Sequence, residues 1–233
     1  FLSSRFDSFE MAQATSSHSN VVLVTGGSRG IGLDVCVSLA KAGLKVYGTI
    51  RSLKEVEPSK KHCKKEEAEV HFIEMDVTND ESVHKAVKAI IDKEKRLGSL
   101  SFFFFFVQQT NKQTNKQTNK NLKKKIHKKK KKDILVNNAG IALPLSSVEK
   151  TSISDYQKVL DVNFFGAIRL MQAVTPQMRA QKHGLIINIS SCISLIGLPF
   201  MSGYTATKAE EDTMQEKRDY YNLKKKKKGV FTS

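Results

Sequence analysis

The sequence predicts a single α/β domain with a doubly wound parallel sheet. Its 233 residues are enough for one domain with a substantial core. Short apolar runs alternate along the chain with stretches in which apolar residues recur at helical spacing. A glycine-rich stretch also joins the first apolar run to the first helical pattern. Strands that alternate with helices in this way pair in parallel and are covered by helices on both faces.

The expected elements follow from these patterns in chain order. Strands are predicted at the apolar runs 21–24, 45–50, 70–75, 134–136 and 185–189. Helices are predicted near 31–42, 82–95 and 154–180 and from 204 onward. This order is typical of the Rossmann-type dinucleotide-binding fold. The segments 21–97 and 133–216 together form the predicted catalytic domain.

The glycine-rich stretch Thr25-Gly26-Gly27-Ser28-Arg29-Gly30-Ile31-Gly32 is predicted to hold a dinucleotide pyrophosphate. Gly26 lets the chain reverse, Gly30 lets the backbone approach the phosphates, and Gly32 lets the helix pack closely on the strand. The N-terminus of the helix then faces the negative charge. A glycine-rich loop without a ligand remains the alternative interpretation.

A second stretch, which contains Tyr204 and Lys208, can move a proton. A carbonyl that accepts hydride must gain a proton on oxygen, and a tyrosine hydroxyl titrates near 10, too high for a base at neutral pH. Lys208 lies one helical turn after Tyr204, and its positive charge is expected to lower the pKa of Tyr204. Tyr204 is therefore the predicted general acid and base.

The Tyr-x-x-x-Lys spacing alone is weak evidence, because it recurs at 220–224 and 221–225. What distinguishes Tyr204 is the isoleucine-rich strand upstream, which ends at Ser191, 13 residues before the tyrosine. Ser190 remains the second candidate for the role of Ser191. Cys192 is interpreted as a small buried residue and not as a nucleophile.

The motifs together resemble the short-chain dehydrogenase/reductase family. In chain order they are T-G-x-x-x-G-x-G at 25–32, Asp76-Val77, Asn137-Asn138-Ala139-Gly140, Asn163, Ser191 and Tyr204/Lys208. The resemblance covers roughly residues 20–97 and 133–214. The stretches 45–51 and 197–200 further resemble the branch of 17β-hydroxysteroid and retinol dehydrogenases.

The resemblance implies an oxidoreductase that transfers hydride between a nicotinamide cofactor and a carbonyl or secondary alcohol, here expected to be lipid-like. It implies that Lys208 holds the nicotinamide ribose, that Ser191 hydrogen-bonds the substrate oxygen, and that Asn163 positions a water in a proton relay. The expected cofactor-binding residues are Gly26, Ser28, Arg29, Gly30, Ile31, Gly32, Arg51, Asp76, Val77, Asn138, Ala139, Gly140, Tyr204 and Lys208. The resemblance also implies that an intact family member can form homo-oligomers, although the sequence does not tell the oligomeric state.

Two of these assignments have alternatives. Asp76 either caps the adenine edge, as the resemblance implies, or only caps a turn before Ser82. The segment 137–140 either closes the fourth strand over the cofactor or is an ordinary turn.

The end of the second strand predicts NADP as the cofactor. NAD enzymes of this fold usually place an acidic residue there to bond the ribose 2′-hydroxyl. Here Arg51 follows the strand, Arg29 adds a second positive charge, and the nearest acid is Glu55. Two arginines and no carboxylate favour the 2′-phosphate of NADP. Solvated surface arginines are the alternative.

The segment 98–132 is predicted to be a low-complexity insertion. It contains five consecutive Phe, repeats of Gln-Thr-Asn-Lys and Lys-rich sequence, a composition typical of translated simple-sequence DNA. Its 11 Lys and the Lys-rich tail at 217–233 account for the net charge of +16. We therefore expect non-specific attraction to polyanions but no specific nucleic-acid recognition. The Phe run is too short to cross a bilayer.

Residues 1–20 are predicted to be a non-native or disordered extension, and the catalytic domain is predicted to be truncated at its C-terminus. Because the strands that follow the Tyr/Lys helix in the family are expected to be missing, we expect the strand at 185–189 to be an open edge, with Ile186, Ile187 and Ile189 left uncovered. Poor solubility and negligible turnover are expected to follow. The alternative function is accordingly an inactive fragment that binds nucleotide or polyanions.

Cysteine and histidine usage predicts no metal site. The three cysteines are scattered, with no C-x-x-C spacing, and no H-E-x-x-H motif occurs. Unpaired cysteines suit a reducing compartment, which favours a cytoplasmic location. No specific macromolecular partner is indicated.

Overall fold

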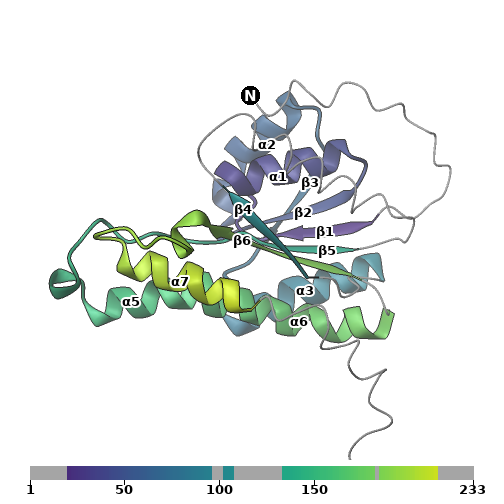
Figure 1. Cartoon of the computed structure of the whole chain (residues 1–233). Helices are drawn as coiled ribbons and strands as arrows, with labels where there is room; N and C mark the ends of the chain where they lie inside the picture. The colour runs from purple at the N-terminus through teal and green to yellow at the C-terminus, as the bar shows by residue number, and fades with distance from the viewer. Residues whose placement is uncertain (1–19, 96–101, 108–132, 182–183, 215–233) are drawn as a thin grey trace, which may run out of the picture.

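The computed structural model describes residues 20–95, 102–107, 133–181 and 184–214. They form a parallel sheet with helices on both faces (Figure 1), in the strand order β3-β2-β1-β5-β6-β4. This arrangement confirms the predicted doubly wound α/β fold. The strands are β1 Val21–Val24, β2 Lys45–Ile50, β3 Val70–Glu74, β4 Phe102–Val107, β5 Ile134–Asn137 and β6 Leu185–Ser191.

The helices alternate with these strands. The α-helices are α1 Gly30–Lys41, α2 Glu57–Lys65, α3 Asp80–Glu94, α5 Ile153–Leu160, α6 Gly166–Gln181 and α7 Ser202–Thr213. The shorter helical turns are η1 Leu53–Glu55, η2 Val148–Lys150, η3 Asp161–Phe165 and η4 Cys192–Ser194. The described residues include no helix that is both long and apolar enough to span a bilayer.

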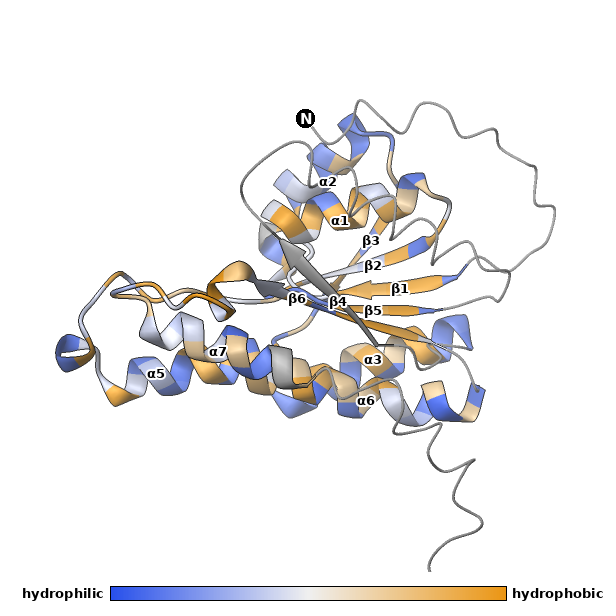
Figure 2. Ribbon diagram, viewed as in Figure 1, coloured by the Kyte–Doolittle hydropathy of each residue, from blue (hydrophilic) through white to orange (hydrophobic). Residues whose placement is uncertain are grey.

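Strand β1 contributes to hydrophobic clusters on both faces of the sheet. Val21 and Leu23 belong to the cluster that α3 and α6 cover, and Val22 and Val24 to the cluster that α1 covers. Successive side chains of a strand point to opposite faces, so a continuous apolar run is what a doubly covered strand requires. Figure 2 shows the same distribution, with hydrophobic colour along the central strands and hydrophilic colour on the outer helix faces.

The predicted helix at 154–180 is interrupted. A π-helical turn, η3, separates α5 from α6 and contains Asn163, which is fully buried. Such turns insert a residue into an α-helix and are frequent at functional sites. The 3.6-residue periodicity could not predict it, because a single inserted residue leaves the apolar pattern on either side intact.

The expectation of an open edge beside β6 is wrong. Strand β4 lies parallel to β6, with Phe102 opposite Ile186 and Val107 opposite Ser191. Ile186, Ile187 and Ile189 are buried, with exposed fractions of 0, 5 and 9%. An edge strand presents unpaired N–H and C=O groups to any extended segment, and an aromatic run has high strand propensity. The sheet therefore takes its last strand from the predicted insertion at 98–132.

The other predicted segments at the ends and in the insertion fall largely outside the described residues. These are 1–19, 108–132 and 215–233, which include Tyr220 and Tyr221. The domain boundaries drawn from the sequence remain predictions.

Candidate active site

The glycine turn, residues 25–32, leaves no room for a side chain at Gly27 or Gly32 and little room at Gly26. Gly26 has a φ of +62° and Gly30 a φ of +53°, in the left-handed region that favours glycine. A Cβ atom on Gly32 would lie 2.2 Å from the Gly26 carbonyl oxygen. A Cβ atom on Gly26 would lie 3.1 Å from Ala139 Cα. The roles predicted for Gly26 and Gly32, chain reversal and close packing, agree with these contacts.

Thr25 joins the glycine turn to the loop that follows β5. Its hydroxyl oxygen accepts hydrogen bonds from the backbone N–H groups of Asn138 and Ala139, both at 2.9 Å. The Asn138 side-chain amide donates in return to the Thr25 carbonyl at 3.0 Å. No role was predicted for Thr25 from the sequence, although its position directly after β1 places it at the carboxyl edge of the sheet.

The N-terminus of α1 is suited to an anion. Arg29 is the N-cap residue, in extended conformation, and no side chain accepts a hydrogen bond from the first turn of α1. Backbone N–H groups in the first turn of a helix have no partner within the helix, and the helix dipole is positive there. Arg29, Gly30 and Ile31 are exposed, and a Cβ atom on Gly30 would meet nothing within 4 Å. These features fit a dinucleotide pyrophosphate.

Arg51 and Asp76 follow the carboxyl ends of β2 and β3. Arg51 is exposed. Burial disfavours the Asp76 carboxylate, but two hydrogen bonds from Thr78 and the charges of Arg51 and Arg169 outweigh it and lower the pKa of Asp76. The Asp76 carboxylate therefore caps the turn at Thr78 and is also attracted electrostatically by Arg51. Val77 is buried and packs against Gly166 of α6.

Asn163 links the loop after β5 to α7. Its side-chain oxygen accepts from the Ile141 N–H at 2.8 Å, and its side-chain nitrogen donates to the Ile141 carbonyl at 2.9 Å and to Thr207 Oγ1 at 3.0 Å. Both N–H donors of the amide are thus in use. A Cβ atom on Gly140 would lie 3.4 Å from Asn163 Oδ1, so the motif at 137–140 packs against the same residue. The water relay remains a prediction.

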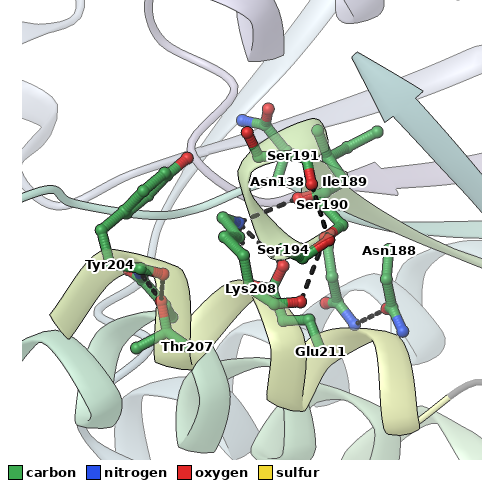
Figure 3. Close-up of polar contacts among 12 residues, drawn as sticks. Asn138, Asn188, Ile189, Ser190, Ser191, Ser194, Tyr204, Thr207, Lys208 and Glu211 are labelled. Carbon is green, nitrogen blue, oxygen red and sulfur yellow. Dashed lines mark hydrogen bonds and ion pairs between the residues drawn. The ribbon is translucent and has the colours of Figure 1, made fainter. Parts of the chain in front are cut away.

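Tyr204 lies on α7, next to the end of β6 (Figure 3). Burial and the negative charge of Glu211 raise its pKa, Cys192 adds to the rise, and a hydrogen bond with Ser191 opposes it. The prediction that Lys208 lowers this pKa is wrong. The Lys208 ammonium lies 5.7 Å from the centre of the Tyr204 ring, and Glu211 neutralises it.

Ser191 and Ser190 differ in their contacts. Ser190 is buried, and its hydroxyl donates to the Lys208 carbonyl at 3.2 Å. Ser191 is partly exposed at the end of β6, and its hydroxyl accepts from the Ile193 N–H at 3.4 Å. The side chain that adjoins Tyr204 is therefore Ser191, whereas Ser190 helps to hold α7 on the sheet.

Lys208 makes an ion pair that the sequence analysis missed. Its ammonium lies 2.8 Å from one Glu211 carboxylate oxygen, and both side chains are 5% exposed. Residues 204, 208 and 211 have the i, i+4, i+7 spacing of one helix face. The sequence shows this spacing, but it could not predict that Glu211 is buried.

The predicted site residues thus gather at the carboxyl ends of the parallel strands, the edge at which such sheets bind ligands. The glycine turn follows β1, the 137–140 motif begins at the last residue of β5, and Ser191 is the last residue of β6. The described residues contain no group of His, Cys, Asp and Glu that could hold a metal ion. A family model described as short chain dehydrogenase matches residues 20–102 and 95–217.

The chain belongs to the short-chain dehydrogenase family.

Relatives of this family are similar to the chain over most of its length. A 3-ketodihydrosphingosine reductase from Bacteroides thetaiotaomicron is 31% identical over 192 residues, which are 81% of this chain and 53% of that protein. Human retinol dehydrogenase 8 is 31% identical over 197 residues, 80% of this chain and 49% of that protein. The likeness to the retinol dehydrogenase branch is thereby confirmed. The chain spans about half the length of both relatives.

Solved structures share the fold. A short-chain dehydrogenase from Streptomyces avermitilis is 25% identical, with a TM-score of 0.65, and the match covers 86% of this chain and 60% of that one. A metagenomic short-chain oxidoreductase, solved in complex with NADP, is 22% identical with a TM-score of 0.67, over 90% of this chain and 79% of that one. The second likeness supports the fold alone.

Proposed function

We propose that the chain is an NADP-dependent oxidoreductase that interconverts a carbonyl and a secondary alcohol, with Tyr204 as general acid and base. The observation that carries this proposal is the position of Tyr204. Its hydroxyl adjoins Ser191 at the carboxyl edge of the sheet, the edge that also holds the glycine turn. A proton donor, a second hydroxyl and an anion-binding helix terminus at one edge suit hydride transfer to a carbonyl.

Bound NADPH would supply the hydride, and the residues of the chain would manage the proton and the geometry. The first turn of α1 would hold the pyrophosphate, and Lys208 the nicotinamide ribose. The Ser191 hydroxyl would donate a hydrogen bond to the substrate oxygen. Tyr204 would give its proton to that oxygen as the carbonyl is reduced and would take a proton from the alcohol in the reverse direction. Asn163 would orient a water that returns the proton to the tyrosine.

The loops beside Tyr204 favour an apolar substrate. Leu145, Leu195, Ile196, Leu198 and Phe200 are 49 to 70% exposed on the loops that follow β5 and β6. A backbone hydrogen bond from the Ser146 N–H to the Phe200 carbonyl, 3.2 Å long, joins the two loops. Apolar walls with a few polar groups are typical of sites for small apolar ligands. The relatives named for 3-ketodihydrosphingosine and retinol agree with a lipid-like substrate. The three free cysteines favour a cytoplasmic location.

The proton-transfer role is tested with Tyr204→Phe. The change removes the acidic hydroxyl but keeps the ring, so NADPH oxidation with a panel of short- and long-chain ketones should fall about 10²-fold to 10⁴-fold. NADPH binding, measured by fluorescence titration, should persist. Tyr156→Phe is the matched control, since the Tyr156 hydroxyl bonds Ser202 at 2.6 Å, away from Ser191. Equal losses in the two variants would contradict the assignment.

The cofactor preference is tested with Arg51→Asp. Reversing the charge at the end of β2 should weaken NADPH binding about tenfold, the value of one charge-assisted hydrogen bond, and improve NADH binding. Arg179→Asp makes the same charge reversal on the exposed end of α6 and should leave the ratio of the two affinities unchanged. If both variants keep the wild-type ratio, Arg51 does not contact the 2′-phosphate.

The alternative is a nucleotide-binding protein without turnover. The observation that favours this alternative is that the three donors of Lys208 are already occupied within the protein. NADPH binding together with the absence of oxidation across the ketone panel would favour this alternative.

A further inference from the structure

The ammonium group of Lys208 has no donor to spare. It donates to the Ile189 carbonyl at 3.0 Å and to the two carboxylate oxygens of Glu211 at 3.0 and 2.8 Å (Figure 3). A lysine ammonium has three N–H donors, so these acceptors use all of them. A ribose hydroxyl can bond Lys208 only by displacing one of them.

Burial makes the Glu211 contact a strong competitor. Lys208 and Glu211 are each 4% exposed, so little water can screen the pair. A carboxylate at this depth is costly unless it is paired and hydrogen-bonded. The Ile189 carbonyl belongs to the β6 backbone and cannot leave without disturbing the sheet. Glu211 is therefore the partner that must yield when Lys208 turns toward a ligand.

We propose that Glu211 is a positioning residue that competes with the nicotinamide ribose for Lys208 and so sets both cofactor affinity and the charge beside Tyr204. This inference rests on the proposed function. With Glu211 engaged, Lys208 is neutralised and held against β6. With Glu211 released, the ammonium can bond the ribose and its charge acts on the tyrosine hydroxyl.

The charge balance around Tyr204 has a directional consequence. Three titratable groups face Tyr204: Glu211 and Lys208 from the same helix and Cys192 from η4. Glu211 and Cys192 raise the pKa of Tyr204, after the larger effect of burial, and the Lys208 ammonium lies 5.7 Å from the centre of the ring. Ser191 opposes them through a neutral hydrogen bond. The tyrosine therefore keeps its proton at neutral pH. In this state Tyr204 can donate a proton to a carbonyl oxygen, whereas its action as a base depends on the charge of Lys208.

Three variants of the full chain test the proposal. Glu211→Gln removes the charge and keeps the shape, and Glu211→Leu removes every acceptor. Glu210→Gln makes the same chemical change one residue earlier, on the exposed face of α7. The ligands are NADPH and adenosine 2′,5′-bisphosphate, which carries the adenosine half of NADPH but no nicotinamide ribose.

The expected result separates the two halves of the cofactor. Both Glu211 variants should bind NADPH about tenfold more tightly, the value of one hydrogen bond to a charged group, and the bisphosphate as the wild type does. Ultraviolet titration, with Tyr204→Phe as the reference that identifies the Tyr204 signal, should show ionisation at lower pH in Glu211→Gln. Glu210→Gln should change none of these readouts. Wild-type NADPH affinity and an unmoved Tyr204 titration in Glu211→Gln would overturn the proposal.

Folding is monitored separately, because Glu211→Gln and Glu211→Leu leave Lys208 buried beside a neutral group. If both variants unfold, Lys208→Met is compared with Lys208→Met/Glu211→Leu, since apolar replacement of a buried pair is often tolerated. The double variant should ionise Tyr204 at lower pH than Lys208→Met, and equal titrations would again overturn the role of Glu211. If no variant binds either ligand, the proposed function fails, while the tyrosine titration still decides the role of Glu211.

Discussion

Two parts of the site are held together by different chemistry. The glycine turn is held by neutral groups. The Thr25 hydroxyl accepts hydrogen bonds from two backbone N–H groups, and close contacts at the glycines set the distance between the turn and its neighbours. At the catalytic corner, formed by Ser191, Tyr204, Lys208 and Glu211, a buried ion pair holds the key cation. The first arrangement leaves the donors at the N-terminus of α1 without a side-chain cap, whereas the second occupies every donor of Lys208. We therefore expect the turn to accept an anion without rearrangement, whereas Lys208 can bind a ligand only after it releases one of its partners.

The largest effect is expected where the glycine turn has no room. Gly32→Ala would place a methyl group 2.2 Å from the Gly26 carbonyl oxygen, so the turn must shift. A displacement of about 1 Å can cost about 10²-fold in an active site, and we expect a loss of NADPH affinity of that order, measured by fluorescence titration. Gly197→Ala is the control, because its nearest neighbour, Thr205 Cγ2, would be 3.9 Å away. Tight NADPH binding by Gly32→Ala would show that the turn is not preformed.

Substitutions of Thr25 and Thr207 compare the stability contributions of the glycine turn and the catalytic corner. Thr25→Val leaves the N–H groups of Asn138 and Ala139 without their acceptor, and we expect a loss of about 2–3 kcal/mol in the free energy of unfolding. Thr207→Val removes the acceptor of a single Asn163 N–H and should cost about 1 kcal/mol. Urea denaturation measures both, and Thr25→Ser, which keeps the hydroxyl, should recover most of the loss. A larger loss in the free energy of unfolding for Thr207→Val than for Thr25→Val would contradict this prediction.

The smallest effect concerns acid stability near the cofactor edge. Bonds from Thr78 and the charges of Arg51 and Arg169 lower the pKa of Asp76 despite its partial burial. The stabilisation is therefore complete above about pH 4, the ordinary range of aspartate, and is lost as the pH falls through the lower folded value. In urea denaturation from pH 7 downward, Asp76→Asn should lose less stability on acidification than the wild type. Asp34→Asn, on α1, provides the comparison, and identical acid profiles for all three proteins would contradict the linkage.

Local patterns predicted much of the site. The glycine spacing identified the turn, since the conformational needs of Gly26 and Gly30 depend on their own backbone angles. The strand that ends at Ser191 was the signal that distinguished Tyr204 from the later tyrosines, and the structure brings Tyr204 beside the end of this strand, while the catalytic role remains a prediction. Thr25, by contrast, was missed because its partners Asn138 and Ala139 lie more than a hundred positions away in the chain.

Two sequence-based expectations were wrong, for reasons that involve neighbours and not spacing. The charge of Lys208 was expected to lower the pKa of Tyr204, but burial and, after it, the carboxylate of Glu211 raise that pKa. The edge of β6 was expected to be open, but strand pairing accepts any extended segment, and Phe102–Val107 supplies one. In both cases the sequence identified one group correctly, the Lys208 cation or the β6 edge, but not the group that pairs with it, Glu211 or β4.

The sequence by itself determined the alternation of five strands with helices, the glycine turn and the family, because apolar periodicity and glycine placement act within a few residues. Only the tertiary structure decided which groups share a low-dielectric interior. Glu211 and Lys208 have the i, i+3 spacing of ion pairs that are common on helix surfaces, but here both side chains are buried, so the Lys208 ammonium is held by the Glu211 carboxylate. Pairing with β6 makes the low-complexity segment 102–107 part of the sheet. Burial and strand pairing depend on the whole fold, so no local pattern contains them.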